Sequence, residues 1–259
     1  MSRPDQSAPA SLVPPFQVEL TFIGDLNYFL GPEAQKTVVR QIKERTSVKD
    51  IIEACGIPHT EVDRIFVNGR AVDFSHVLNE NTAIDVHSVN VTGGEFCGNP
   101  LQTRNMSRFV LDGHLGKLAR NLRLLGFDVL YQNAAEDRQL LDAMQREKRA
   151  LISRDRRLLM HSMVRHGYCP RSQDHEEQTL EVLRRFNLAA LMRPFSRCLT
   201  CNAELQTAEK KDVFDQLEPL TKIYYEDFRR CLGCGKIYWG GSHFDKLRAR
   251  VEKIRARVQ

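Results

Sequence analysis

The sequence predicts an α/β protein: a parallel sheet with flanking helices, preceded by a β-rich domain and followed by a small cysteine-rich module. Three observations predict this organisation. Strand and hairpin patterns begin at residue 16. Strands and helices alternate from residue 108 onward. Two C-x-x-C pairs then follow between residues 198 and 234. With 259 residues the chain is long enough for two ordinary domains and a small module.

The N-terminal region has the order strand, strand, helix, strand, strand. The expected elements are residues 16–22, 36–42, 48–55, 65–67 and 84–89. Thr46 or Ser47 caps the helix, and Asn68-Gly69 is a typical hairpin turn. This order resembles the β-grasp fold of ubiquitin and of the small sulfur-carrier proteins. We therefore expect a ubiquitin-like β-grasp domain at residues 16–92, after a disordered tail at residues 1–15 that is rich in Pro, Ser and Ala.

A Gly93-Gly94 pair follows the last expected strand of this domain. Sulfur carriers end in such a pair, whose terminal carboxylate is activated. Here the chain continues with Glu95, so a free carboxylate would require cleavage. Because clustered glycines usually mark loops, we expect residues 93–105 to be a linker. A sulfur-carrier-like modification factor stays a minor alternative that needs a processed Gly94 terminus.

From residue 108 the apolar pattern alternates between strand and helix periodicity. The expected strands are residues 109–111, 129–131 and 150–153, and the expected helices are residues 115–125, 137–149, 158–164 and 178–186. Such alternation predicts a mainly parallel sheet with helices on both faces. We assign residues 106–195 to this domain.

Three aspartates occupy positions where this fold would place a site. Asp112 follows the first strand, Asp155 follows the third, and Asp137 opens a helix. The carboxyl ends of parallel strands share one edge of the sheet, where ligands bind. Carboxylate oxygens at that edge could hold Mg²⁺ or Mn²⁺. Each aspartate taken alone could instead be only a helix cap, whereas Asp128 and Asp142 are expected to be solvated surface.

The net charge of +5 conceals an asymmetry between the two parts of the chain. Residues 1–104 carry 9 Lys and Arg against 13 Asp and Glu, which gives −4, and residues 105–259 carry 29 against 20, which gives +9. The basic part is the candidate partner of a polyanion. Basic residues near the acids that could contact a phosphate backbone are Lys117, Arg120, Arg154 and Arg156. His114 could donate a proton or contact phosphate, although a structural role is favoured.

The strongest signal from spacing alone is the pair of knuckles Cys198-x-x-Cys201 and Cys231-x-x-Cys234, with 29 residues between them. Four thiolates fit a closed tetrahedral zinc site, so we expect a zinc ribbon at residues 196–243 with structural zinc. A closed site leaves no position for water, and this zinc is therefore not expected to be catalytic. The odd total of seven cysteines argues against a disulfide framework.

Aromatic and basic residues follow the second knuckle. Tyr238 and Trp239, with His243 close by, could stack on unpaired RNA bases, or the aromatic rings could pack against protein, which is favoured. The excess of Lys and Arg over Asp and Glu in residues 244–259 predicts a basic C-terminal helix. It could be an RNA-binding arm or a frayed, solvated helix.

Residues 108–159 contain the segments LDGHLGKLARNLRLLGFDV, EDRQLLDA and ALISRDRRLL. These resemble PIN-like nucleases and, more closely, the RNase domain named after the C-terminus of the mutator-seven exonuclease. A β-grasp domain and a zinc ribbon often flank the nuclease core in that family, so the resemblance covers about residues 16–245. It implies a PIN-like parallel sheet and a metal-dependent ribonuclease.

Carried over by position, the acidic site of that family falls on Asp112, Asp137 and Asp155, and Asp174 is a candidate fourth acid. The resemblance implies magnesium or manganese at this catalytic site, besides the structural zinc. RNA is the implied substrate, with tRNA among the candidates, and the β-grasp domain could bind a protein partner.

A non-catalytic adaptor that binds RNA or tRNA is the alternative function, because the same basic surface and zinc ribbon could hold RNA without cutting it. The chain has no apolar run long enough for a membrane span and no basic start followed by an apolar core. We therefore expect a cytoplasmic protein without membrane contact.

Overall fold

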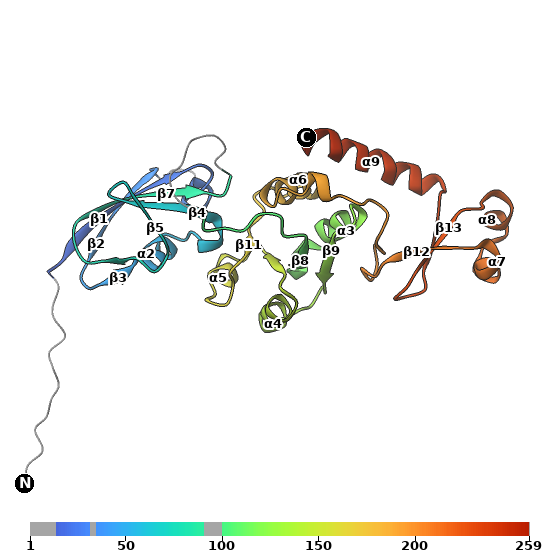
Figure 1. The fold of residues 1–259 in the computed structure, drawn as a ribbon, viewed down its shortest axis with the longest axis horizontal. Coiled ribbons are helices and arrows are strands. Elements are labelled where there is room, and N and C mark those ends of the chain that lie inside the picture. Colours follow the sequence, from blue (N-terminus) through green and yellow to red (C-terminus); the bar gives the residue numbers. More distant parts are fainter. Residues whose placement is uncertain (1–13, 32–34, 91–99, 259) are drawn as a thin grey trace, which may run out of the picture. The chain divides into compact units, whose positions relative to one another are not determined.

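The structure is a computed structural model that describes residues 14–31, 35–90 and 100–258. It divides after Leu101 into two compact units, called the N-terminal and the C-terminal unit (Figure 1). The expected tail, up to residue 13, and the Gly93-Gly94 pair lie outside the described residues. None of the described helices is long and apolar enough to cross a membrane.

The N-terminal unit is built on a five-stranded sheet in the order β2-β1-β7-β4-β5. The central strands β1 and β7 are parallel, and the other neighbours are antiparallel. Its elements are β1 (Phe16–Ile23), α1 (Asn27–Leu30), β2 (Thr37–Ile42), β3 (Thr46–Ser47), α2 (Val48–Ala54), a 3-10 turn (His59–Glu61), β4 (Val62–Val67), β5 (Arg70–Val72), β6 (Val77–Leu78) and β7 (Thr82–Ser88). Two hairpins around a helix, with the first and last strands parallel, confirm the expected β-grasp fold.

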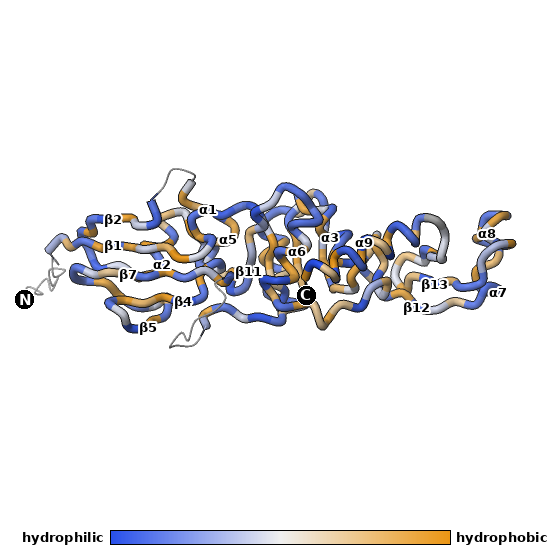
Figure 2. Tube along the Cα trace, turned by 90° about the horizontal axis from the view of Figure 1, so that it is seen from above, coloured by the Kyte–Doolittle hydropathy of each residue, from blue (hydrophilic) through white to orange (hydrophobic). Residues whose placement is uncertain are grey.

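Local sequence accounts for these elements. Every second residue of β1 is buried from Phe16 to Phe22, and hydrophobic residues recur along this strand in Figure 2. Helix α2 begins where the Ser47 hydroxyl accepts a hydrogen bond from the Asp50 backbone N–H at 3.1 Å. Asn68 and Gly69 both have positive φ, 48° and 78°, as a tight turn between β4 and β5 requires.

The C-terminal unit begins with a four-stranded sheet in the order β11-β10-β8-β9, in which all neighbours are parallel. Its elements are β8 (Arg108–Leu111), a 3-10 turn (Gly113–Leu115), α3 (Gly116–Leu124), β9 (Asp128–Tyr131), α4 (Asp137–Glu147), β10 (Ala150–Ile152), α5 (Arg156–Leu159), β11 (Gly167–Tyr168), α6 (His175–Arg185) and a 3-10 turn (Ala189–Leu191). This confirms the expected parallel sheet with flanking helices.

Both faces of this sheet are covered. Phe109 and Leu111 of β8 belong to the core that α3 and α6 share. Val110, between them in the sequence, is also buried but is not part of that core. Because neighbouring strand residues point to opposite faces, Val110 lies on the other side, where α4 packs against β8 and β10. The strands are therefore apolar throughout, as expected of a buried parallel sheet.

One expectation for this region needs correction, and one strand was not predicted. The helix expected at residues 158–164 is only the four-residue α5, and it ends at Leu159. Strand β11 has no sequence pattern because it is only two residues long; the backbone N–H groups of Leu151 and Ser153 hold it by donating to the carbonyls of His166 and Tyr168.

The last part of the C-terminal unit is a three-stranded antiparallel sheet in the order β12-β13-β14, followed by a long helix. Its elements are β12 (Leu205–Ala208), α7 (Lys210–Val213), a 3-10 turn (Phe214–Gln216), α8 (Pro219–Tyr224), β13 (Phe228–Cys231), β14 (Ile237–Trp239) and α9 (Ser242–Val258). The short helices lie between β12 and β13 along the chain.

Helix α9 is neither a detached arm nor a frayed helix. Val251 and Ile254 are buried in the core shared with α6. Arg257 forms a 2.8 Å ion pair with Glu177, and Lys253 forms one of 2.7 Å with Glu176. Part of the basic charge of α9 therefore pairs with α6, which sequence periodicity could not show.

Candidate functional site

Asp112 and Asp155 follow neighbouring parallel strands, β8 and β10, and the structure connects them through Ser153. The fully buried Ser153 hydroxyl donates to Asp112 Oδ2 at 2.7 Å and accepts from the Asp155 backbone N–H at 2.9 Å. Asp155 Oδ1 caps α5 by accepting from the N–H groups of Arg157 and Leu158 at 2.8 and 3.2 Å. Among the described residues, Asp112 Oδ1 and Asp155 Oδ2 have no hydrogen bond or ion pair.

The loop after Asp112 packs closely against the loop after β9. A Cβ added to Gly113 would lie 2.4 Å from the Asn133 carbonyl oxygen, so no larger residue fits there. The Tyr131 hydroxyl donates to the Gly113 carbonyl at 2.8 Å. This close approach accounts for the DG dipeptide and holds the end of β8 against the end of β9.

Asp137 and Asp174 both lie at the start of a helix, but only Asp174 caps its helix. Asp137 is the first residue of α4, whose cap is Glu136 with Gln139, so its exposed carboxylate is not the cap. Asp174 caps α6 by accepting from the N–H groups of Glu176 and Glu177 at 2.9 and 3.0 Å, and the pKa of its carboxyl is lowered, chiefly by the Glu177 N–H. Capping thus describes Asp155 and Asp174, but not Asp112 or Asp137.

The basic residues expected near this edge differ in exposure and in the contacts that they make. Lys117 and Arg120 are exposed on α3, three residues apart, and neither forms an ion pair with a described residue. Arg154 instead donates to Gln173 Oε1. His114 is exposed in the turn between Asp112 and α3.

The four cysteines of the two knuckles come together as the spacing predicts. Their sulfurs all lie within 4.8 Å of one another, with 3.7 Å between Cys198 and Cys234 and 3.3 Å between Cys201 and Cys231. Sulfurs placed tetrahedrally around zinc lie about 3.8 Å apart, so the donor set fits this ion. Within the described part of the chain, no other group of three or more Cys, His, Asp or Glu side chains gathers in this way.

The pKa values of two of these thiols move in opposite directions. Burial would raise the pKa of Cys198, but hydrogen bonds from the Cys201 N–H and the Tyr238 hydroxyl outweigh it and lower the pKa to about 6. Burial and the neighbouring sulfurs raise the pKa of Cys201 to about 12. Four crowded thiolates repel one another until a metal neutralises them.

Tyr238 belongs to this cysteine cluster. Its hydroxyl lies 3.1 Å from Cys198 Sγ and accepts from the Leu199 N–H at 3.2 Å. Burial raises its pKa, so it stays a neutral donor. Trp239 is more open, with 39% of its surface exposed, and His243 is exposed at the start of α9.

Two buried arginines connect the first knuckle and the parallel sheet, and sequence reasoning missed both. Arg123 of α3 donates to the carbonyls of Val129 at 2.9 Å and Thr200 at 2.9 Å. Arg149 donates to Asp128 Oδ1 at 2.7 Å. The side chain of Asn202 completes the link by donating to the same Asp128 oxygen at 2.8 Å.

Asp128 is therefore not the solvated residue that the sequence predicts. Its side chain is 18% exposed and contacts both Arg149 and Asn202. Burial alone would raise the pKa of Asp128, but the hydrogen bonds from Arg149 and Asn202 outweigh it and lower the pKa to about 2. Its contacts are with residues distant in the sequence, so no local pattern could have identified it.

The lowered pKa of Asp128 makes the C-terminal unit sensitive to acid. The stabilisation is present above the ordinary pKa of 3.8 and is lost as the pH falls through about 2. The shift corresponds to roughly 2 kcal/mol of unfolding free energy. Urea unfolding of wild type and Asp128→Asn should therefore differ most near neutral pH and converge in acid. A difference that is independent of pH would contradict this assignment.

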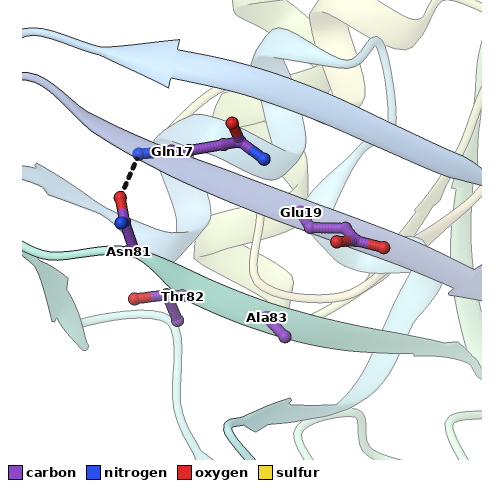
Figure 3. Close-up of a pocket in the computed structure, with 5 residues that line it drawn as sticks. All are labelled: Gln17, Glu19, Asn81, Thr82 and Ala83. Carbon is purple, nitrogen blue, oxygen red and sulfur yellow. Dashed lines mark hydrogen bonds between the residues drawn. The ribbon is translucent and has the colours of Figure 1, made fainter.

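The N-terminal unit has a shallow hollow on its sheet. Figure 3 shows it over β1 and the start of β7, where Asn81 Oδ1 accepts from the Gln17 backbone N–H at 2.7 Å. It is lined by Gln17, Glu19, Asn81, Thr82 and Ala83. Its lining has one carboxylate and one hydroxyl but no Lys, Arg, His or Cys side chain, so we place no site there.

Two family models match the two units of the chain separately. The family model of the Mut7-C RNAse domain matches residues 107–251, and that of the Mut7-C ubiquitin domain matches residues 16–91. A search of curated proteins finds no match. The solution structure of the Haloferax volcanii HVO 2177 protein is 18% identical, with 36% of this chain and 100% of that chain covered and a TM-score of 0.26. The RNAse-domain match contains both the acidic edge and the four cysteines.

Proposed function

Because the chain belongs to the Mut7-C RNAse domain family, we propose that it is a metal-dependent ribonuclease that hydrolyses RNA phosphodiester bonds. The observation that carries this proposal is the Asp112-Ser153-Asp155 arrangement at the carboxyl edge of the parallel sheet. Ligand sites of parallel α/β sheets lie at this edge. In the same proposal the four cysteines hold structural zinc.

The free carboxylate oxygens suit magnesium or manganese. Asp112 Oδ1 and Asp155 Oδ2 have no protein partner among the described residues, and no described cation neutralises either carboxylate. Magnesium is usually held by one or two carboxylates together with waters and substrate phosphates. We therefore assign the direct ligands to Asp112 and Asp155, with Asp137 binding through water.

The other residues of this edge would bind and orient the substrate. A bound divalent cation supplies an activated water and stabilises charge on the scissile phosphate. Ser153 holds the Asp112 carboxylate in one orientation through its 2.7 Å hydrogen bond. The unpaired Lys117 and Arg120 would bind backbone phosphates on either side of the cut. His114 stands exposed beside Asp112, where it could protonate the leaving oxygen.

The remaining expected RNA contacts either flank Asp155 or follow the second knuckle in the sequence. Arg154 and Arg156 flank Asp155 in the sequence and are assigned to phosphate binding, and Asp174 is assigned only to capping α6. Trp239 and His243, both exposed, are assigned to base contacts, whereas the Tyr238 hydroxyl is engaged at the cysteine cluster. We also propose that the ubiquitin-like unit binds a protein partner.

One observation favours a second candidate, the RNA-binding adaptor. Within the described residues, the three carboxylates of Asp112, Asp137 and Asp155 do not gather at ligand distance as the cysteines do. An adaptor would use the basic surface of the C-terminal unit to hold RNA without cutting it.

A cleavage assay distinguishes the two candidates. The zinc-loaded full chain would be incubated with tRNA, a structured RNA and a single-stranded RNA, each with Mn²⁺, Mg²⁺ or EDTA at one ionic strength. The ribonuclease predicts cleavage that requires the divalent ion, and the preferred RNA identifies the substrate class. RNA that is bound but stays intact with every metal would support the adaptor.

Replacing Ser153 should weaken the binding of the catalytic metal without unfolding the protein. In Ser153→Ala, Asp112 Oδ2 loses its donor and the carboxylate can rotate. Residues that orient a metal ligand in this way typically contribute 10–100-fold, so the Mn²⁺ concentration for half-maximal cleavage should rise about tenfold. Ser162→Ala, at an exposed position after α5, is the matched control. An equal Mn²⁺ requirement in both variants would argue against this role.

A further inference from the structure

Helix α8 presents its apolar side chains to solvent. Leu220, Ile223 and Tyr224 are 67%, 66% and 72% exposed, whereas Thr221 is the buried residue of this helix. Positions separated by three and four residues lie on one face of a helix, so the three apolar side chains form one ridge. Figure 2 shows hydrophobic residues in α8. An amphipathic helix at a protein surface normally turns such residues toward the core.

The three side chains of this ridge do not belong to the small hydrophobic core of this region. It consists of Val213, Leu217 and Phe228, packed against Ala208, Tyr225 and Ile237. Phe214 next to α8 is also 44% exposed, and the Lys222 ammonium lies 4.6 Å from the centre of its ring. We call Phe214, Leu220, Ile223 and Tyr224 the α8 surface. Exposed apolar side chains that gather on one helix face mark interaction sites.

The residues that flank the α8 surface in the sequence are mostly acidic, in contrast to the rest of this part of the chain. Residues 209–227 carry six acidic and three basic side chains, which gives −3, within a region of +9 from residue 105. Lys210 pairs with Glu226 and Lys211 pairs with Glu209. The acids that form no ion pair with a described residue are Asp212, Asp215, Glu218 and Asp227.

We propose that the α8 surface docks a basic amphipathic helix of a partner protein, with apolar residues at helical spacing and Lys or Arg beside them. A helical ridge packs into the groove between side chains of another helix, and the unpaired acids would attract the flanking cations. The same acids repel the RNA backbone. They also oppose face-to-face pairing of two copies, because such a pair would bring two surfaces of −3 together.

The test uses the zinc-loaded full chain and a fluorescent model peptide. The peptide has about 18 residues, enough to form a helix, with a leucine stripe flanked by lysines. A second peptide carries glutamates in place of the lysines. The proteins are wild type, Leu220→Ser/Ile223→Ser, and Leu191→Ser, which changes an apolar residue that is 47% exposed outside the α8 surface and outside the knuckles.

Wild type and Leu191→Ser should bind the lysine peptide, and Leu220→Ser/Ile223→Ser should bind it at least about tenfold more weakly. The glutamate peptide should bind poorly to all three. Since the replaced side chains are exposed, the melting temperature should not change. Equal binding by wild type and the double variant would overturn the proposal. So would a wild-type dimer that the double variant loses, or RNA binding that falls with it, since these identify a second copy or RNA as the occupant.

Discussion

Removal of the metal from the four cysteines should unfold the ribbon and loosen the adjoining edge of the parallel sheet. The ribbon has a small core of three buried residues, so zinc would supply much of its folding free energy. Cys198→Ser, or chelation of wild type, should lower the unfolding free energy of the C-terminal unit by more than about 4 kcal/mol.

The loss should extend to the parallel sheet because the first knuckle contacts β9. The Val129 backbone N–H donates to Asn202 Oδ1 at 2.9 Å, and Arg123 donates to the Thr200 carbonyl. Hydrogen exchange of the Val129 amide should therefore accelerate when zinc leaves. Cys55→Ser, which changes a cysteine of the N-terminal unit, should keep both zinc content and Val129 protection. A zinc-free protein with unchanged unfolding and exchange would contradict the structural role.

Asp112→Asn should abolish RNA cleavage while leaving RNA binding intact. Asparagine keeps the shape of the side chain and can still accept the Ser153 hydrogen bond, but it lacks the charge that a divalent cation requires. A metal contributes several kcal/mol to such a reaction, so the single-turnover rate should fall at least about a hundredfold.

Asp142→Asn is the matched control for this variant. Asp142 is exposed on α4 and forms no hydrogen bond or ion pair with a described residue. Its replacement should leave both cleavage and RNA affinity unchanged. Equal cleavage rates for Asp112→Asn and Asp142→Asn would remove Asp112 from the site and count against the ribonuclease.

The features that the sequence predicted correctly depend on local patterns. Alternating burial in β1, the Ser47 cap of α2 and the Asn68-Gly69 turn each follow from a few neighbouring residues. The cysteine cluster follows from two short spacings. The positions of Asp112 and Asp155 at one sheet edge follow from the strand order, because both follow parallel strands.

The features that the sequence did not predict depend on distant contacts. Asp128 pairs with Arg149 and Asn202, which are 21 and 74 residues away. Strand β11 is too short for periodicity; backbone hydrogen bonds to β10 hold it, and the Tyr168 side chain is buried in the core. The composition of α9 indicates a basic helix but not that Val251 and Ile254 pack against α6. In each case the deciding partner lies elsewhere in the chain.

The measurement that tests the central claim most directly is Mn²⁺ binding to the acidic edge, followed by the electron paramagnetic resonance signal of the free ion. Zinc-loaded wild type, Asp112→Asn and Asp155→Asn would be titrated, and RNA cleavage measured on the same samples. The account predicts that wild type binds Mn²⁺, that cleavage rises with its occupancy, and that both variants lose the two together. Mn²⁺ binding that is equal in all three proteins, or cleavage that proceeds without bound Mn²⁺, would contradict it.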